Sequence, residues 1–331
     1  MKTFEYASPA SAELAVQALG VNANSAALSG GTDLLARMKD YVTSPERVVY
    51  LKDIKSLSGI TGDPKSGGLT IGAGATLADI LHHKGIEESY PALRQATVEV
   101  GTPQIRHMAT LGGNLLQRPR CWYYRSGFGL LGMKDGKSLV RDGDNRYHAI
   151  FMTDGDALFV SPSSLAVPLI ALGARATVLG NEGERTISLE KLYKVPRNND
   201  DRELTLAPGE LLTKVTVPEA RGKNGSYEAR QKRAHDWPLV MAAVNLEMDG
   251  DRVSDARVVI YGVAPVPWRS KPAEQALQGK AISTESATAA GAAAAEGAKP
   301  LSMNGFKVPL TRAVVKRAIL AAVGNRYWEE A

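Results

Sequence analysis

Two short segments with paired glycines, residues 29–33 (SGGTD) and 110–114 (TLGGN), constrain the fold of this chain most strongly. Each follows an apolar segment, and the first leads into the helical pattern LLARMK. Paired glycines let backbone N–H groups approach a phosphate closely, and a following helix offers its positive end. A single loop of this kind is equally consistent with a simple strand-to-helix turn. Two of them suggest a ligand with a long phosphate-bearing spine, such as a dinucleotide.

The segments around the first loop predict an α/β domain. A helix is expected after Ser8 and Pro9, a strand at residues 26–28, and a helix after the loop that Thr32 or Asp33 could cap. RVVYLKDI and GLTIGAG predict further strands, and TLADILHH predicts a helix in which Thr76 and Asp79 have capping-box spacing. Strands that alternate with helices are typical of this fold class.

The length of 331 residues and a polar stretch with turn residues near residue 220 predict more than one domain. We expect a first domain at residues 1–219, with lobes at about 1–58 and 59–219, and a second at 220–331. The polar stretch 220–226 indicates a linker between them. The second domain should be α+β: two strands joined by a hairpin at Asp249, Gly250 and Asp251, and then three helical stretches, PAEQALQ, SATAAGAAAAEGA and LTRAVVKRAILAAV.

Composition excludes several classes of protein. Hydrophobic residues make up 44% and charged residues 23% of the chain, and no window approaches the roughly 18 uninterrupted apolar residues of a membrane span. The N-terminus lacks the pattern of an export signal, so we expect none in this chain. The single cysteine, Cys121, excludes an internal disulfide and a four-thiolate metal or iron–sulfur site built by this chain alone.

The net charge of +5 is concentrated in one segment. Residues 117–150 hold seven basic and three acidic residues, which leaves +4 there, interleaved with Trp122, Tyr123 and Tyr124. Such a stripe could bind nucleic acid, but no nucleic-acid motif accompanies it. We therefore expect a surface that faces a cofactor or a subunit, on a long insertion without helical or strand periodicity.

Other signatures of catalysis fail. Residues 72–74 read GAG between a strand and a helix, but Leu77 stands where the third glycine of a dinucleotide fingerprint belongs. GMKDGKS has one residue too few between its glycines for a phosphate-binding loop. Five histidines form no metal-binding pair, and no nucleophile elbow is present. We expect no catalytic acid–base residue and no metal ligand in this chain.

These motifs resemble the FAD-binding medium subunit of the molybdenum hydroxylases, the family of xanthine dehydrogenase, carbon monoxide dehydrogenase and bacterial aldehyde oxidoreductases. SGGTDLLARMK and ATLGGNLLQRPRCWYYR resemble the two flavin loops of that family, and LTIGAGATLADI its middle segment. NRYHAIF and GVAPVPWR are similar to stretches further along. The resemblance covers nearly the whole chain.

The resemblance implies an α+β fold: a two-lobed FAD-binding domain of the vanillyl-alcohol oxidase (PCMH) type, followed by a small α+β C-terminal domain. It implies FAD in this chain, bound without a covalent link, with the molybdenum cofactor in a large partner subunit and two [2Fe–2S] clusters in a small one. The cofactor-binding residues expected from the loops and the resemblance are Ser29, Gly30, Gly31, Thr32, Asp33, Leu34, Thr110, Gly112, Gly113, Asn114 and Ser164.

Three departures from the family pattern stand out. Some relatives hold a [4Fe–4S] cluster on four cysteines of the insertion, whereas here only Cys121 remains and Ala157 stands where the last cysteine is expected, so we expect no such cluster. Ser164 replaces an acidic residue that follows H-P-S in the family. Ala229 replaces a frequent lysine, for which Arg230 or Lys232 could substitute.

The leading hypothesis is therefore an oxidoreductase subunit of a hetero-oligomer that carries electrons from partner [2Fe–2S] clusters through FAD to an external acceptor. We expect an aldehyde as the substrate of the complex, and N-heterocycles or aromatic acyl-CoA compounds are the next alternatives. The alternatives are a non-redox scaffold subunit of the same complex and a self-standing flavin oxidase. We expect a cytoplasmic location, or a periplasmic one if a partner subunit carries an export signal.

Overall fold

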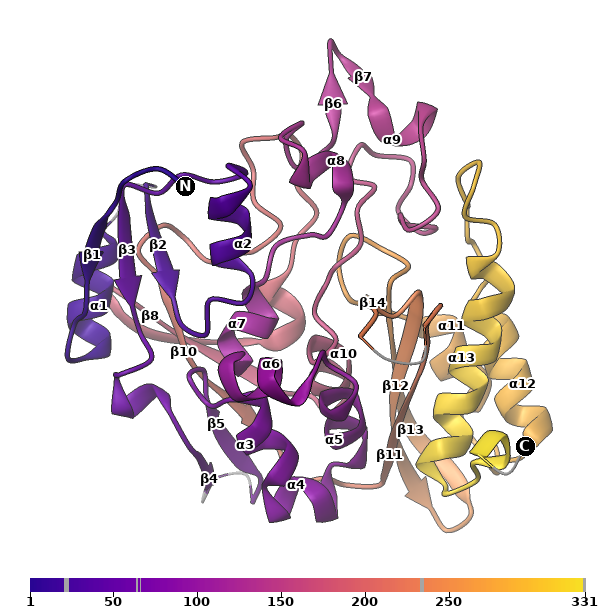
Figure 1. Ribbon diagram of the computed structural model, residues 1–331. Helices are drawn as coiled ribbons and strands as arrows, with labels where there is room; N and C mark the ends of the chain where they lie inside the picture. The colour runs from indigo at the N-terminus through magenta and orange to yellow at the C-terminus, as the bar shows by residue number, and fades with distance from the viewer. Residues whose placement is uncertain (21–23, 64, 66, 233–234, 330–331) are drawn as a thin grey trace.

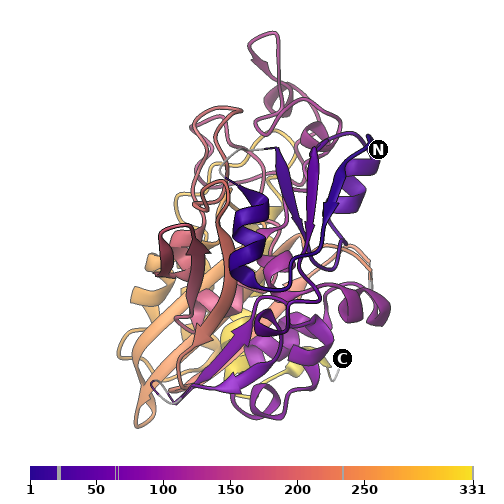
Figure 2. The ribbon, with the colours of Figure 1, turned by 90° about the vertical axis from the view of Figure 1, so that its left-hand side faces the viewer.

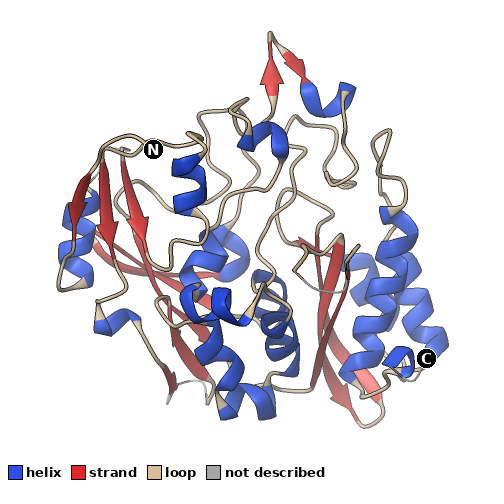
Figure 3. Ribbon diagram, in the orientation of Figure 1, coloured by secondary structure: helices blue, strands red, loops and turns tan. Residues whose placement is uncertain are grey.

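The computed structural model describes residues 1–20, 24–63, 65, 67–232 and 235–329, and it divides into two lobes and a C-terminal domain (Figure 1). The lobes lie side by side, with the C-terminal domain against the second lobe and the insertion above the junction (Figures 1 and 3). The expected mixture of helices and sheets, with a separate α+β domain at the C-terminus, is confirmed.

The first lobe is a small parallel sheet with a helix on either face. Strands β1 (Glu5–Ala7) and β2 (Ser25–Leu28) both pair with the central β3 (Arg47–Tyr50). Helix α1 (Ala12–Leu19) packs between this sheet and residues of the second lobe, whereas α2 (Leu34–Lys39) packs on the opposite face (Figure 2). Strand β2 runs directly into the first glycine loop, so the loop lies at the carboxyl end of a parallel sheet, where α/β proteins commonly bind ligands.

The second lobe is an antiparallel sheet with the order β4-β5-β10-β8-β9. Its strands are β4 (Ile60–Gly62), β5 (Leu69–Gly72), β8 (Arg175–Gly180), β9 (Gly183–Ser188) and β10 (Leu211–Val217). Strand β10 arrives from late in the sequence and takes the central place between β5 and β8. One face of the sheet shares an apolar core with the helices beside it.

Short helices cover the second lobe and carry the second glycine loop. They are α3 (Leu77–His82), α4 (Lys84–Ser89), α5 (Pro91–Val98), α6 (Pro103–Met108), α7 (Leu111–Leu116) and α10 (Ala166–Ala171). Single 3-10 turns lie before this lobe at η1 (Lys55–Leu57), within it at η2 (Leu189–Leu192), and near the C-terminus at η3 (Tyr327–Glu329). The expected capping box is confirmed, because the Thr76 and Asp79 side chains accept each other's backbone N–H groups at the start of α3.

Two expected caps are wrong. Helix α1 begins at Ala12, not after Ser8 and Pro9, because the Ser11 hydroxyl accepts from the Leu14 N–H group and caps it. The Asp33 side chain makes no capping hydrogen bond to α2. Its carboxylate is instead held by arginine side chains, which outcompete neutral backbone donors for an anion.

The insertion holds more regular structure than its sequence pattern predicts. It contains α8 (Trp122–Arg125), a protruding hairpin of β6 (Met133–Lys134) and β7 (Lys137–Ser138), and α9 (Leu139–Asp142) (Figure 1). These elements are too short for periodicity to reveal. A separate apolar cluster beneath them consists of Tyr124, Leu130, Leu131, Ala157 and Phe159.

The C-terminal domain is one antiparallel sheet covered by helices. Its strands are β11 (Lys223–Ala229), β12 (Val240–Asp249), β13 (Arg252–Tyr261) and β14 (Trp268–Arg269), and its helices are α11 (Lys271–Leu277), α12 (Thr284–Ala293) and α13 (Lys307–Ala322). The hairpin at Gly250 is confirmed. Strand β11 begins inside the segment expected to be a linker, because residues 223–226 pair along β12.

Both faces of the C-terminal sheet are buried. On β12, Met241 and Ala243 face the core of the second lobe, whereas Val240, Ala242 and Val244 face helices α11 to α13. Successive strand residues point to opposite faces, so a strand covered on both sides reads as a continuous apolar run. The sheet is thus the wall that the two domains share.

A polar latch fastens the insertion to the C-terminal domain. The buried Lys307 ammonium donates to the carbonyl oxygens of Tyr147, His148 and Gly262 at 2.7–3.0 Å. Asn304 Nδ2 donates to the carbonyls of His148 and Ala149. Unpaired carbonyls would be costly in such a buried position, so these bonds fix where the end of the insertion lies.

A second polar contact between the domains places three charged groups together. Arg230, directly after β11, forms ion pairs with Glu99, which follows α5, and with Glu228 on β11. The Arg230 Nε lies 2.9 Å from Glu228 Oε1, but the two groups are not oriented for a hydrogen bond. Burial raises the pKa of Glu228 from 4.5 to about 8; the Arg230 charge opposes the rise and the Glu99 charge adds to it.

We predict that Lys307→Met lowers the free energy of unfolding by at least about 2 kcal/mol, because three backbone carbonyls lose their shared donor. Urea denaturation followed by circular dichroism measures the change. Lys299→Met is the matched control, since it removes only an exposed ion pair with Asp154, worth less than about 1 kcal/mol. Equal midpoints for the two variants would show that the latch does not hold the insertion.

We also predict that Glu228→Gln gains stability relative to the wild type as the pH rises from about 4.5 to 8. In this window the folded wild type retains a proton that the unfolded chain has released, so rising pH favours unfolding of the wild type but not of the variant. Thermal unfolding at several pH values measures the difference. Glu247→Gln, at an exposed carboxyl on β12, is the control. A difference that does not change with pH contradicts the prediction.

Candidate functional site

The first glycine loop is packed against the segment that precedes the second. A Cβ on Gly30 would lie 1.9 Å from the carbonyl oxygen of Met108, so only glycine fits. Gly31 has a φ of +72°, which L side chains rarely adopt. The first loop is therefore in direct backbone contact with the segment that leads into the second.

The backbone N–H groups of the first loop are available to a ligand. Within the described ranges, those of Gly30, Gly31, Thr32 and Asp33 donate no hydrogen bond. The Ser29 hydroxyl is buried beside the same space and also lacks a partner there. Buried polar groups without a partner are rare in folded proteins, and a ligand with acceptor oxygens would satisfy these.

The second loop is different, because its own fold uses its amides. Gly112 donates to the Ala73 carbonyl at 2.8 Å, and Gly113 donates to Thr110 Oγ1 at 3.2 Å. Asn114 Oδ1 accepts from Ser163 Oγ at 2.8 Å. A Cβ on Gly113 would meet nothing within 4 Å except Thr110 Oγ1, so the space above this glycine is open. The second loop offers shape and a bare backbone surface more than free donors.

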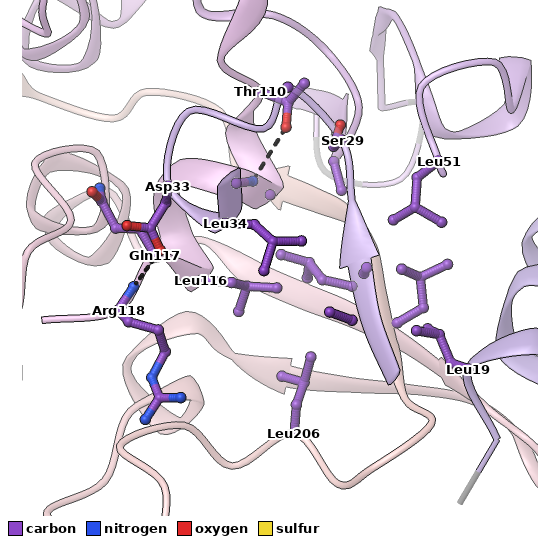
Figure 4. A pocket seen from close by; sticks show the side chains of 18 of the residues that line it. Leu19, Ser29, Asp33, Leu34, Leu51, Thr110, Leu116, Gln117, Arg118 and Leu206 are labelled. Atoms are coloured by element: carbon purple, nitrogen blue, oxygen red, sulfur yellow. Dashed lines mark hydrogen bonds between the residues drawn. The ribbon is translucent and has the colours of Figure 1, made fainter. Parts of the chain in front are cut away.

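A cavity of about 390 Å³ lies between the two lobes (Figure 4). Leu19, Leu51, Leu116 and Leu206 surround one part of it, and Arg118 lies with Asp33 and Gln117 at another (Figure 4). An apolar compartment beside polar groups fits a ligand with a flat ring at one end and charged groups beyond it.

A second cavity of about 230 Å³ lies between the first domain and the C-terminal domain. One wall comes from residues 99–102 and the other from residues 235–238, with Asn114 and Ser164 among the lining residues. The two cavities share the lining residues Thr32, Asp33, Gly113 and Gln117. Together they measure about 620 Å³, in the range of about 300–1,000 Å³ for small-molecule sites.

The structure brings together every site residue expected from the sequence. The first cavity is lined by Ser29, Gly30, Gly31, Thr32, Asp33, Leu34, Thr110, Gly112 and Gly113, and the second by Thr32, Asp33, Gly113, Asn114 and Ser164. Leu34 also packs into the small core of the first lobe. The glycine loops lie where the cavities meet.

Sequence reasoning missed several residues that line these cavities. They are Gln117, Arg118, Arg120, Arg37, Arg202, residues 206–212 and the segment 235–238. The basic excess after the second loop was the one available signal, because it placed Arg118 and Arg120 close behind the glycines. Residues 206–212 and 235–238 carry no motif and reach the site only through the tertiary fold.

The departures from the family pattern now have places in the structure. Ser164 is buried on the wall of the second cavity, and Ala157 lies in the apolar cluster of the insertion. Arg230 is engaged by Glu99 and Glu228. Ala229 ends strand β11 opposite Val240.

Cys121 and His148 form a partly buried contact of 3.2 Å between Sγ and Nε2. Burial raises the pKa of the Cys121 thiol, and burial, aided by the Lys307 charge, lowers the pKa of His148 to about 4. Both groups are therefore neutral near pH 7, so the pair lacks the thiolate that a nucleophile or metal ligand needs. In the part of the chain that the structure describes, no three His, Cys, Asp or Glu side chains gather as a metal site.

The residues present fit a dinucleotide that spans both cavities. The free amides of the first loop, the unpartnered Ser29 hydroxyl and the open face of Gly113 all line the larger cavity, which leucines also line. Among the described helices, none is long and apolar enough to cross a membrane.

Comparison with protein families divides the chain as the structure does. Residues 2–220 match the FAD binding domain in molybdopterin dehydrogenase, and residues 225–322 match the CO dehydrogenase flavoprotein C-terminal domain. The first match covers more than half of the chain.

Individual relatives agree with these matches. The FAD-binding subunit of an aldehyde oxidoreductase of Escherichia coli K12 is 30% identical, over 97% of this chain and 99% of its own. The carbon monoxide dehydrogenase medium chain of Hydrogenophaga pseudoflava is 26% identical, over 96% of each chain.

Solved structures give the same fold. A chain of carbon monoxide dehydrogenase from Hydrogenophaga pseudoflava, in a form that lacks the Mo-pyranopterin moiety of the molybdenum cofactor, superposes with a TM-score of 0.75 at 25% identity, covering 98% of both chains. A chain of quinoline 2-oxidoreductase from Pseudomonas putida 86 gives 0.76 at 24% identity, covering 98% of this chain and 99% of that one. The chain therefore belongs to the family of FAD-binding subunits of molybdenum hydroxylases, and its first domain is the family's FAD-binding domain.

Proposed function

We propose that this chain holds FAD across both cavities and works as the electron-transfer subunit of a molybdenum hydroxylase complex. The observation that carries the proposal is the meeting of two cavities at two glycine loops, with free donors on the first loop and open space above Gly113. FAD supplies the uptake and release of electrons, and the chain binds the cofactor, orients it and excludes water.

The larger cavity suits the adenosine half of FAD and the smaller one suits the flavin ring. Leucines line the larger cavity, where an adenine ring could pack. The smaller cavity lies at the junction with the C-terminal domain and is lined by Ile105, Trp237 and Pro238. The residues shared by both cavities, Gly113 among them, then lie beside the diphosphate, and the other loop glycines line the larger cavity next to them.

The complex we propose contains a large subunit with the molybdenum cofactor and a small subunit with [2Fe–2S] clusters. Electrons would pass from those clusters to FAD and on to an external acceptor. An aldehyde is the proposed substrate, because the relative with 30% identity belongs to an aldehyde oxidoreductase. Cell fractionation would test the proposed cytoplasmic location, or a periplasmic one if a partner carries an export signal.

We predict that Gly113→Val weakens FAD binding at least about tenfold, because its side chain would fill the open space beside the shared lining. Flavin content after purification and titration of the apoprotein with FAD measure the effect. Gly155→Val is the matched control, because a Cβ there meets nothing within 4 Å and its φ lies outside the positive range. Normal flavin content in Gly113→Val would contradict this assignment of the cavity.

We predict that an aldehyde bleaches the flavin absorption band only when the chain is purified with its large and small partner subunits. The isolated chain should bind FAD but show no bleaching, because its described residues offer no thiolate or metal cluster for substrate oxidation. Anaerobic absorption spectra measure both. Bleaching by the isolated chain would support a self-standing oxidase, and the absence of any flavin from the complex would support a scaffold.

A further inference from the structure

The carboxylate of Asp33, between the two cavities, is surrounded by arginines. Arg37 Nε lies 3.1 Å from its Oδ2, while Arg120 and Arg125 lie 3.1 and 2.8 Å from its Oδ1. The Arg118 N–H group also donates to Asp33 Oδ2 at 3.2 Å. Arg37 comes from the first lobe, and the others come from the start of the insertion.

This cluster carries more positive than negative charge. Three guanidinium groups share one carboxylate, which leaves an excess of two positive charges, and all four side chains are at most 31% exposed. Burial alone would raise the pKa of Asp33, but the three arginines outweigh it and lower this pKa, so the carboxylate is ionised. Like charges held together away from water are unfavourable unless an anion joins them.

Two of the three arginines face the cavities, whereas Arg125 lines neither. Arg37 lines the larger cavity, and Arg120 lines the smaller one. Arg120 donates to Gln117 Oε1 at 3.0 Å and stacks on Trp237 at 4.6 Å, yet its Nε is buried without a hydrogen-bond partner. Burial lowers the pKa of Arg120, and Arg125 and Arg37 add to this effect against the pull of Asp33. An unused donor and uncompensated charge thus meet beside the first glycine loop.

We propose that Asp33 organises Arg37, Arg120 and Arg125 as the counter-charge for the diphosphate of FAD, so that the insertion is part of the cofactor site. The inference rests on the proposed function. A dinucleotide diphosphate carries one negative charge on each phosphate, which matches the excess of the cluster. Asp33 then positions arginines rather than touching phosphate itself, which its own charge would oppose.

The test compares Arg120→Gln with Arg141→Gln in the full chain. Arg141 lies on the same insertion but donates to the carbonyls of Thr153 and Gly155 and lines neither cavity. We expect Arg120→Gln to weaken FAD binding roughly ten- to hundredfold, the loss typical of hydrogen bonds to charged groups, and Arg141→Gln to leave it unchanged. Riboflavin, which lacks phosphate, should bind Arg141→Gln and Arg37→Gln as it binds the wild type, because neither arginine lines the cavity proposed for the flavin ring.

Two further variants, the dependence on salt and the stability of the apoprotein separate a charge effect from a structural one. Arg120→Lys keeps the charge and should restore most of the affinity, and Arg37→Gln, which leaves the Trp237 contact intact, should weaken FAD binding in the same direction. The gap between wild type and variants should shrink as salt rises, because ions screen the charges. The thermal midpoint of the apoprotein should not fall in Arg120→Gln, since one repulsive charge is removed.

The outcomes distinguish this inference from the proposed function. Calorimetric titration with inorganic pyrophosphate probes the arginines without a flavin. If the wild type binds pyrophosphate and Arg120→Gln binds it more weakly, but neither binds FAD, the arginine cluster stands and the flavin proposal fails. If Arg120→Gln binds FAD and pyrophosphate as tightly as the wild type, the inference is overturned and the flavin proposal stands.

Discussion

The contact between the backbone of Gly30 and the carbonyl of Met108 holds the two lobes in register. No side chain fits between them, so the first loop lies directly on the chain that leads to the second. That chain is fixed in turn by the pairing of Thr76 with Thr110 and by hydrogen bonds to Ala73 and Ala75. Both loops line the larger cavity, so its shape depends on this contact.

The insertion is held at both ends by different means. Its first residues meet Asp33 and Glu203 through arginines, and its last residues meet Lys307 and Asn304 through backbone carbonyls. Just beyond the insertion, Ala157 and Phe159 complete the apolar cluster that contains Tyr124, Leu130 and Leu131. Packing and ion pairs therefore give this segment a defined shape with a single cysteine.

Local patterns predicted much of the architecture. Strand and helix alternation, the hairpin at Gly250 and the capping box at Thr76 depend on residues close in sequence, and all are present. Ser8 and Pro9 misled the prediction of the first helix start because Ser11 offers an equivalent cap. The wall formed by Trp237 and the partners of Asp33 in the insertion could not be predicted, because these contacts join residues about 85 to 120 positions apart or depend on the meeting of two domains.

The position of the glycine loops at a cavity was predictable, but the difference in hydrogen bonding between the two loops was not. Both sequences read as equivalent cradles, yet only the first keeps its amides free. The amides of the second close the turn at Thr110 and bond to Ala73, which a sequence cannot reveal without the neighbouring strand.

The smaller cavity has one wall in each domain, and this gives it a thermodynamic consequence. A ligand bound there touches residues 99–102 and residues 235–238 at once, so its binding free energy also holds the domains together. By linkage, a ligand present at a hundred times its dissociation constant adds about 2.7 kcal/mol to the stability of the form that binds it. The concentration of the cofactor and the thermodynamic stability of the folded chain are therefore linked.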